Sequence, residues 1–358
     1  MDNQGLLFIP DISGYTKFIN NTEIEHSRYI IQELLEVLVN SNNIDLKISE
    51  IEGDAILFYR FGKAPSVEQM YQQVEKMFCN FHKYTRQYQQ RRICQCKACE
   101  GVKDLTLKVI THHGEFSTYT VKQFSKLIGK DVIKAHQLLK NDIPLHEYWL
   151  VTDDIYHGDK KENLPEWLEW KEGKKLDDAN EIDFHYSMLS PLRDKLPVES
   201  EDQFGIKGDS KLMMSVQKEF NEDIDTMFRT VADLSLRPQW MDGVNAIDNV
   251  TTKIPQVGTG HNCIVGKNAR VLVTSGFKKD DKSITIEETD PKRTFTGQFL
   301  LEKKGENKTL MTFNCLLRKN PLLLTIFKLF MKKKMEKTIK KSLDNLENYL
   351  NSQKQVAA

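Results

Sequence analysis

Two carboxylates near the N-terminus have the type and spacing that metal chemistry needs. Asp11 ends a short apolar strand predicted from Leu6, and Asp54 sits at the tip of a predicted β-hairpin. If the two strands are neighbours in one sheet, both carboxylates converge and offer hard oxygen ligands to Mg²⁺ or Mn²⁺. Backbone N–H groups of a helix beginning near Gly14 would then face a triphosphate. The alternative is that Asp11 caps the helix and Asp54 is an ordinary turn residue.

A cysteine cluster is the second group with chemical potential. Cys94, Cys96 and Cys99 lie within six residues and could supply three tetrahedral ligands to a structural Zn²⁺. Cys79 or His82, on the preceding predicted helix, could bring the fourth ligand. The alternatives are ordinary thiols or a redox-sensitive loop. The sequence contains neither a P-loop nor a dinucleotide-binding glycine pattern.

Length and composition bound the class of protein. The chain has 358 residues, 39% hydrophobic and 28% charged, with a formal net charge of zero. That length favours two domains. No apolar run approaches the ~20 residues of a membrane span, and the N-terminus lacks the basic start of a signal peptide. We therefore expect a cytoplasmic protein, and nothing in the charge indicates a nucleic-acid partner.

Hydrophobic periodicity in the first half predicts an α+β sandwich of ferredoxin-like type, over residues 1–189. The expected order is strand, helix, strand, strand, helix, strand, helix, strand. The predicted strands are 6–12, 45–52, 55–61, 105–114 and 148–152, and the predicted helices are 14–38, 66–91 and 131–140.

A charged stretch with Pro191, Pro197, Gly205 and Gly208 predicts a linker over 190–209. A second domain is expected over 210–352, with a tail at 353–358. It should begin with a strand and a helix, continue with antiparallel strands and close with a long helix. The predicted strands are 212–220, 261–265, 270–277, 283–289, 294–303 and 309–318, and the helices are 221–234 and 322–350.

Five segments of the first half resemble, in order, the motifs of class III adenylate and guanylate cyclases. They are residues 8–16 (FIPDISGYT), 52–58 (EGDAILF), 108–115 (KVITHHGE), 127–135 (LIGKDVIKA) and 149–152 (WLVT). The resemblance covers about 6–158. It implies a nucleotidyl-cyclase fold, a nucleotide ligand, and a homodimer in which two protomers share each active site.

By position, the resemblance assigns roles to particular residues. Asp11 and Asp54, with the carbonyl of Ile12, correspond to the metal ligands. Glu50 and Lys126 fall at the two positions that recognise the purine base. The residues whose backbone would bind the phosphates correspond to Gly14, Tyr15 and Thr16.

The sequence departs from the family where the transition state is stabilised. The family has an Asn and an Arg where this chain has Ile133 and Gln137. Neither can replace a ribose-binding amide or a phosphate-binding guanidinium. Lys134, His136 and Gln137 itself are the weak candidates for a substitute, with Lys140 nearby. The resemblance therefore implies metal and nucleotide binding more than catalysis.

The second half resembles the START-like superfamily (SRPBCC; polyketide cyclases and lipid-transfer proteins) through its element order and residues 223–233 and 237–241. The resemblance implies a helix-grip fold with a cavity for an apolar small molecule or lipid. Candidate lining residues, which could equally be ordinary core, are Met227, Phe228, Trp240, Val271, Phe299, Phe313 and Phe327.

The last predicted helix combines a lysine run with an apolar stretch. Lys332–Lys334 follow Phe327 and 329–331. This pattern predicts either a peripheral membrane contact or a solvated face.

Three functional hypotheses follow. The leading one is a signalling protein in which a degenerate cyclase-like domain is coupled to an apolar-ligand domain. The second is an active cyclase regulated by its fused domain, and the third is a non-catalytic dimerisation scaffold.

Overall fold

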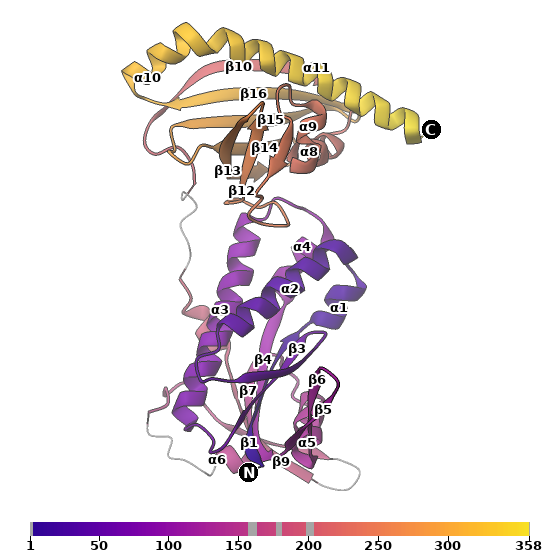
Figure 1. The fold of residues 1–358 in the computed structure, drawn as a ribbon, viewed down its shortest axis with the longest axis vertical. Helices are drawn as coiled ribbons and strands as arrows, with labels where there is room; N and C mark the ends of the chain where they lie inside the picture. Colours follow the sequence, from indigo (N-terminus) through magenta and orange to yellow (C-terminus); the bar gives the residue numbers. More distant parts are fainter. Residues whose placement is uncertain (1–2, 157–162, 177–180, 198–203, 358) are drawn as a thin grey trace. The chain divides into compact units, whose positions relative to one another are not determined.

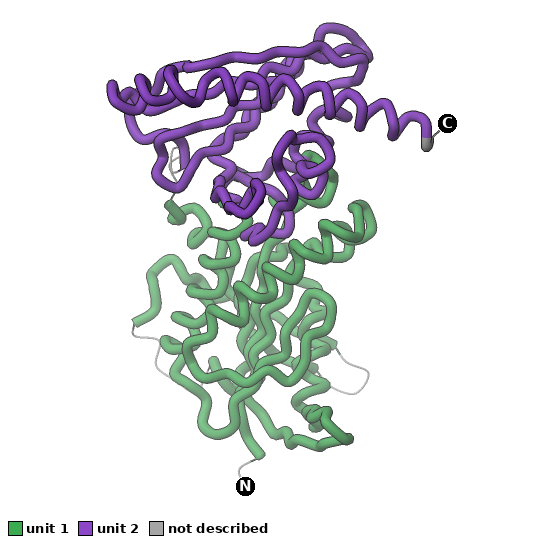
Figure 2. The backbone as a smooth tube through the Cα atoms, turned by 45° about the horizontal axis from the view of Figure 1, so that its top comes forward, with its two compact units in different colours: residues 1–89, 95–199 green, residues 90–94, 200–358 purple. Residues whose placement is uncertain are grey.

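The computed structural model describes residues 3–156, 163–176, 181–197 and 204–357. The chain divides into two compact units, residues 1–89 with 95–199 and residues 90–94 with 200–358 (Figure 2). Both mix helices with a sheet, so the predicted α+β class is confirmed. Within the described residues, no helix is both long and apolar enough to cross a bilayer.

The first unit is built on a seven-stranded sheet in the order β2-β3-β1-β4-β7-β9-β8. Its pairs are antiparallel except for the parallel pair β4–β7. A separate hairpin, β5–β6, follows β4. The strands are β1 Gln4–Ser13, β2 Lys47–Glu52, β3 Ala55–Phe61, β4 Thr106–Glu115, β5 Ser117–Val121, β6 Phe124–Ile128, β7 Tyr148–Thr152, β8 Lys171–Leu176 and β9 Glu181–Met188.

Helices cover both faces of this sheet, which explains why β1 is apolar on both sides. Leu7 and Ile9 share a buried cluster with α5, whereas Leu6 and Phe8 point to the other face and are equally buried. On that other face, Tyr71 of α3 contacts Trp149 of β7. The helices are α1 Tyr15–Asn20, α2 Ile24–Asn40, α3 Val67–Arg91, α4 Lys97–Gly101, α5 Lys130–Leu139, α6 Asp153–Tyr156 and α7 Ser190–Asp194, with a 3₁₀ turn at Val102–Asp104.

The predicted elements of the first unit are present, except that the helix expected over 14–38 is divided into α1 and α2 at residues 21–23, and four strands were missed. β5, β6 and β8 are short and largely exposed, and the apolar residues of β5 and β6 (Tyr119, Val121, Phe124 and Ile128) lie on the surface. β9 does alternate, with Ile182 and Phe184 buried, although charged residues surround it. α7 lies inside the segment that was expected to be a linker.

The second unit contains a seven-stranded antiparallel sheet in the order β10-β16-β15-β14-β13-β12-β11 (Figure 1). All the expected strands are present, together with the short β11. The strands are β10 Ser210–Phe220, β11 Ala246–Asp248, β12 Gly260–Val265, β13 Asn268–Lys279, β14 Ser283–Thr289, β15 Phe295–Gly305 and β16 Lys308–Arg318.

One apolar core joins this sheet to its helices. The long C-terminal helix α11 contributes Ile339, Leu343, Leu346 and Leu350 to the core, at the spacing of one helical face. Asp223 caps α8 by accepting from the backbone N–H groups of Asp225 and Thr226. The helices are α8 Ile224–Ala232, α9 Arg237–Trp240, α10 Pro321–Ile326 and α11 Lys332–Ala357, with a 3₁₀ turn at Leu234–Leu236 and a π-helical turn at Phe327–Met331 between α10 and α11.

Candidate functional site

The two predicted metal-ligand aspartates lie at the same end of adjacent strands. Asp11, in β1, is opposite Ala55 of β3 and Lys108 of β4. Asp54 lies in the β2–β3 turn, and its carbonyl oxygen accepts from the Ile12 N–H at 3.0 Å. The central position of β1 therefore brings the two carboxylates to one end of the sheet.

The electrostatics of the pair indicate mutual proximity. Burial raises the pKa of Asp11 to about 6, Lys108 opposes that rise, and the charge of Asp54 adds to it. Burial also raises the pKa of Asp54. Lys108 Nζ lies 3.6 Å from Asp11 Oδ2 and donates to the Leu139 carbonyl at 3.2 Å. The chain thus provides its own cation beside Asp11.

These donors fit a hard divalent cation. Two partly desolvated carboxylates, one of which raises the pKa of the other, are stabilised by added positive charge, and oxygen is the ligand that Mg²⁺ and Mn²⁺ prefer. Lys108 supplies part of that charge already, so a bound metal has to compete with it.

The segment after Asp11 has the conformation that a close turn requires. Gly14 has φ 90°, in the left-handed region, and precedes the six-residue helix α1. The lining of a groove of about 320 Å³ beside it includes Gly14, three lysines (Lys17, Lys97 and Lys103) and two acids (Glu100 and Asp104). The three lysines and two acids leave the lining with one net positive charge, and α1 is too short for a strong helix dipole.

The two predicted base-recognition residues contact each other directly. Lys126 of β6 forms an ion pair with the carboxylate of Glu50 in β2. His136 Nε2, from α5, lies 3.8 Å from the other oxygen of Glu50. The hairpin β5–β6, missed in the sequence, is what carries Lys126 to this position.

Helix α5 carries the two positions at which the sequence departs from the cyclase motifs. Ile133 is 61% exposed on it, and Gln137 is half-buried. The nearby Lys134 Nζ lies 4.0 Å from Asp154. The first turn of α5 is anchored by Asp131, which contacts His112 Nε2 at 3.0 Å and accepts from the Glu115 N–H at 2.7 Å. Burial lowers the pKa of His112. The contact joins β4 to the first turn of α5 and has a structural role.

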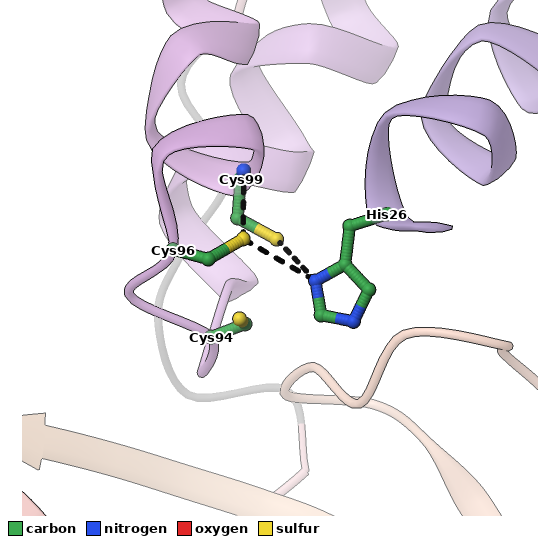
Figure 3. A group of neighbouring side chains, drawn as sticks. All are labelled: His26, Cys94, Cys96 and Cys99. Atoms are coloured by element: carbon green, nitrogen blue, oxygen red, sulfur yellow. Dashed lines mark hydrogen bonds between the residues drawn. The ribbon is translucent and has the colours of Figure 1, made fainter. Parts of the chain in front are cut away.

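The cysteine cluster gains a partner that was not expected (Figure 3). His26 of α2 approaches Cys96 and Cys99, with Nδ1 at 3.3 Å and 3.5 Å from their sulfurs. With Cys94, the ligand atoms of all four residues lie within 4.8 Å of one another, an arrangement able to hold a metal ion.

The fourth ligand expected on α3 is not in this group. His82 is instead buried beside Glu147, with Nε2 3.8 Å from its carboxylate, and burial lowers the pKa of His82 to about 4. Burial raises the pKa of Cys79 to about 11. His26 was missed because it is seventy residues away, on a helix whose pattern showed only its apolar face.

In the second unit, six of the seven predicted cavity residues belong to one buried core. They are Met227, Phe228, Trp240, Phe299, Phe313 and Phe327. The seventh, Val271, is 46% exposed and lies outside it. Val271 lies near the start of β13, where every residue from 268 to 271 is exposed. Its apolar side chain in a predicted strand therefore did not indicate burial.

A buried ion pair in the second unit was also missed. Arg237 donates to both carboxylate oxygens of Glu288, at 2.8 Å and 3.0 Å, and both side chains are almost fully buried. His261 Nε2 lies 4.0 Å from Glu288. The charge of Arg237 lowers the pKa of Glu288 against the opposing effect of burial. A lone Arg and Glu, fifty-one residues apart, give no sequence pattern.

The sequence comparisons cover the first unit only in part. Residues 31–148 match a family model described as a protein of unknown function (DUF2652). An uncharacterized protein of Mycobacterium tuberculosis (Rv2561/Rv2562) is 34% identical over 123 residues, which is 34% of this chain. The matched region spans 57% of that relative's length.

The structural comparisons find cyclase catalytic domains over about half of the chain. The guanylate cyclase domain of RhGC from Catenaria anguillulae, in complex with GTP, is 12% identical, with a TM-score of 0.38, covering 52% of this chain and 96% of that one. The adenylyl cyclase CyaB from P. aeruginosa is 13% identical, with a TM-score of 0.34, covering 52% and 93%. These TM-scores are below 0.5, so the structural comparisons carry no argument about the activity of this chain.

Proposed function

We propose that the first unit is a class III nucleotidyl-cyclase-like domain that binds a divalent cation and a purine nucleotide but has little cyclase activity. One observation carries the proposal: Asp11 and Asp54 meet at the end of β1 and β3, and the charge of Asp54 raises the pKa of Asp11. A chain gains nothing in stability from two carboxylates held in this way. A ligand that brings positive charge explains why both are kept.

Asp11, Asp54 and the Ile12 carbonyl would hold Mg²⁺ or Mn²⁺ in this proposal. When bound, the cation would neutralise phosphate charge. The chain's own residues contribute two further functions. Lys108 stabilises the ionised form of Asp11, and the groove beside Gly14, where three lysines outnumber two acids, would favour an anionic ligand.

The ion pair between Glu50 and Lys126 supports purine recognition. Together the two residues present one acceptor and one donor, and a purine edge offers the complementary pair. Binding a base would replace the ion pair with two hydrogen bonds to the ligand. Because Lys126 is almost half exposed, the pair costs little to open.

The surface of α5 supports the part of the proposal that expects little cyclase activity. Ile133 cannot hydrogen-bond, and Gln137 carries no charge that could stabilise a developing negative charge. Of the weak candidates, Lys134 lies near Asp154 and His136 near Glu50. Losing one such stabiliser typically lowers the rate by about 10²–10³.

For the whole chain, we propose a signalling protein that forms a homodimer through its cyclase-like unit. Its second unit would be START-like and bind an apolar small molecule or lipid. The order β10, α8, α9, then six further strands and α11, supports this proposal, as does the aromatic core that α11 closes.

The test uses the full-length protein and fluorescent mant-GTP and mant-ATP with Mn²⁺. We expect saturable binding of at least one nucleotide, weakened at least tenfold by Asp54→Asn, because the variant loses one of the two charged metal ligands. The matched control Asp142→Asn changes an exposed aspartate and should bind like the wild type. Equal binding by all three proteins, or no binding, would overturn the proposal in favour of a dimerisation scaffold.

A product assay separates the proposal from an active cyclase. The protein is incubated with Mn²⁺ and ATP or GTP, and cyclic nucleotide is measured by mass spectrometry. We expect no product above the Asp54→Ala background. Cyclic product that disappears in Asp54→Ala would instead identify an active enzyme.

A second candidate function, contact with an anionic membrane surface, is favoured by one observation. Leu322, Leu329 and Phe330 are each more than 70% exposed around the π-helical turn. The neighbouring lysines include 328 and 332–334. Exposed large apolar side chains beside lysines suit the headgroup region of an anionic bilayer. Phe327, at the same turn, is buried in the core and would take no part.

Vesicle co-sedimentation tests the membrane contact. We expect binding to vesicles of phosphatidylcholine with phosphatidylserine, weaker binding to phosphatidylcholine alone, and loss of binding in a Leu329→Ser, Phe330→Ser variant. Leu176→Ser removes an equally exposed leucine from the first unit and serves as the control. Equal sedimentation of the variant and the wild type would reject the contact.

A further inference from the structure

The cluster of His26 with three cysteines has the dimensions of a tetrahedral metal site. Ligand bonds of about 2.0–2.3 Å place the ligand atoms of a tetrahedral zinc site about 3.3–3.8 Å apart. His26 Nδ1 lies 3.3 Å from Cys96 Sγ and 3.5 Å from Cys99 Sγ. All four ligand atoms lie within 4.8 Å of one another. A small contraction around an ion would complete the tetrahedron.

The donor set favours a particular ion. Three thiolates and one imidazole are soft or borderline ligands, which select zinc over the hard cations that suit Asp11 and Asp54. The backbone N–H of Cys99 points at Cys96 Sγ at 3.4 Å, and such a donor stabilises a thiolate. With four protein ligands the coordination shell is full, so the site would be structural and not catalytic.

The surrounding contacts hold the ligands in place before any metal binds. Cys96 caps the N-terminus of α4, and Glu23, next to α2, accepts from the Ala98 N–H at 3.3 Å. From α3, Tyr88 Oη donates to Cys99 Sγ at 3.1 Å and Gln89 donates to the Cys99 carbonyl at 3.0 Å. Cys94 is separated from Cys96 by a single residue, so the chain keeps it beside the others.

We propose that His26, Cys94, Cys96 and Cys99 bind one structural Zn²⁺ that fastens α2 to the segment preceding β4. His26 and Cys96 are seventy residues apart, so the ion would link two distant segments, and its binding free energy would add to folding because these ligands meet only in the folded chain. It would also fix α4 beside α1, where the Phe18 ring packs against Gly101. This proposal is independent of whether the cyclase-like site binds nucleotide.

The first test measures metal in the full-length protein purified without chelator. We expect one zinc per chain by mass spectrometry. Replacement with Co²⁺ should give the strong visible bands of a tetrahedral ion and a thiolate charge-transfer band in the near ultraviolet. A chain that takes up neither zinc nor cobalt, or one that holds iron with the absorption of an iron–sulfur cluster, would overturn the proposal.

Variants then test the four ligands. His26→Ala and Cys96→Ser should lower zinc affinity by at least a hundredfold in a chelator competition. His26→Cys should retain the metal, because a Cys₄ site also binds zinc. The control Cys79→Ser removes a thiol outside the group and should keep one zinc.

Chelation of zinc from the wild type distinguishes loss of the metal from misfolding of a variant, because it requires no substitution. Removing zinc from the wild type should lower the unfolding temperature of the first unit, and adding zinc should restore it. Full zinc retention in His26→Ala, or no shift on chelation, would show that these residues do not form the site.

Discussion

Each unit carries an acidic side chain beside a basic one, and the two pairs differ in burial and in pKa. Asp11 meets Lys108 through a single contact of 3.6 Å, and its pKa is raised to about 6. Glu288 accepts two hydrogen bonds from Arg237, and its pKa is lowered although it is completely buried. The first carboxylate is poorly satisfied and the second is fully satisfied.

On our proposal, the difference separates a candidate ligand site from a structural ion pair. A poorly satisfied carboxylate near a second one destabilises the fold and is retained where a ligand will supply charge. A bidentate buried pair leaves no charge for a ligand, and it stabilises only as long as both partners are present. Neutralising one carboxylate and unpairing the other should therefore have effects of opposite sign on stability.

The largest effect is expected from Arg237→Met. It should lower the free energy of unfolding of the second unit by about 3–5 kcal/mol, because Glu288 is left buried without its partner. The loss in free energy is measured by urea unfolding of the full chain, with hydrogen exchange in β14 and β15 as the probe. Arg237→Met with Glu288→Met should recover most of the loss. A loss below about 1 kcal/mol in the single variant would contradict a structural role.

Asp11→Asn should have the opposite effect. The folded state binds the Asp11 proton more tightly than the unfolded state, whose pKa is near 3.8. The stability due to this group is therefore complete below about pH 4 and is lost as the pH rises to about 6. At pH 7–8 the variant, which cannot ionise, should be more stable by about 2–3 kcal/mol.

The measurement for Asp11→Asn is urea unfolding of the first unit at several pH values. The gain should shrink towards pH 4. Asp142→Asn, at an exposed position, should change the free energy of unfolding by less than about 0.5 kcal/mol. A destabilised Asp11→Asn at neutral pH would mean that Asp11 is an ordinary structural acid.

Lys108→Met should tighten Mn²⁺ binding, because the ammonium group competes with the metal for Asp11. We expect about a tenfold lower dissociation constant, since a unit charge about 4 Å away changes an interaction near the surface by a few kcal/mol and desolvation cancels part of this. The control Lys134→Met removes a lysine that lies near Asp154. Weaker Mn²⁺ binding in Lys108→Met would show that the lysine supports the metal.

The smallest effect on stability is expected from Lys126→Met. The ion pair with Glu50 is partly exposed, so its loss should change the free energy of unfolding by less than about 1 kcal/mol. Nucleotide affinity should nevertheless fall severalfold if the pair recognises the base, as mant-nucleotide titration would reveal. Unchanged affinity would remove Glu50 and Lys126 from the site.

The sequence predicted most of the elements because their patterns are local. The alternation of β2 and the helical spacing of α2 and α3 are both visible over short windows, and Gly53-Asp54 marks the hairpin. The strands β5, β6 and β8 were missed because they are short and exposed, so that the apolar residues of β5 and β6 form no fully buried face. The convergence of the two carboxylates was expected from the ferredoxin-like strand arrangement, which the hydrophobic pattern predicted.

The missed site residues share one property: their role depends on contacts between distant parts of the chain. His26 belongs to the cysteine cluster only because α2 passes beside α4. Lys108 faces Asp11 through the register of β1 with β4. Arg237 and Glu288 meet only when α9 packs on β14. A single sequence contains no periodicity that encodes such contacts.

The claim that Asp11 and Asp54 form a ligand site is tested most directly by Mn²⁺ titration of the full-length protein at pH 7.5, with free Mn²⁺ followed by electron paramagnetic resonance. Zinc is kept in all samples so that the metal content of the cysteine cluster is the same in each. We predict a Mn²⁺ site in the wild type that weakens at least tenfold in Asp11→Asn and in Asp54→Asn. Binding that is absent from the wild type, or equal in the three proteins, would contradict the claim.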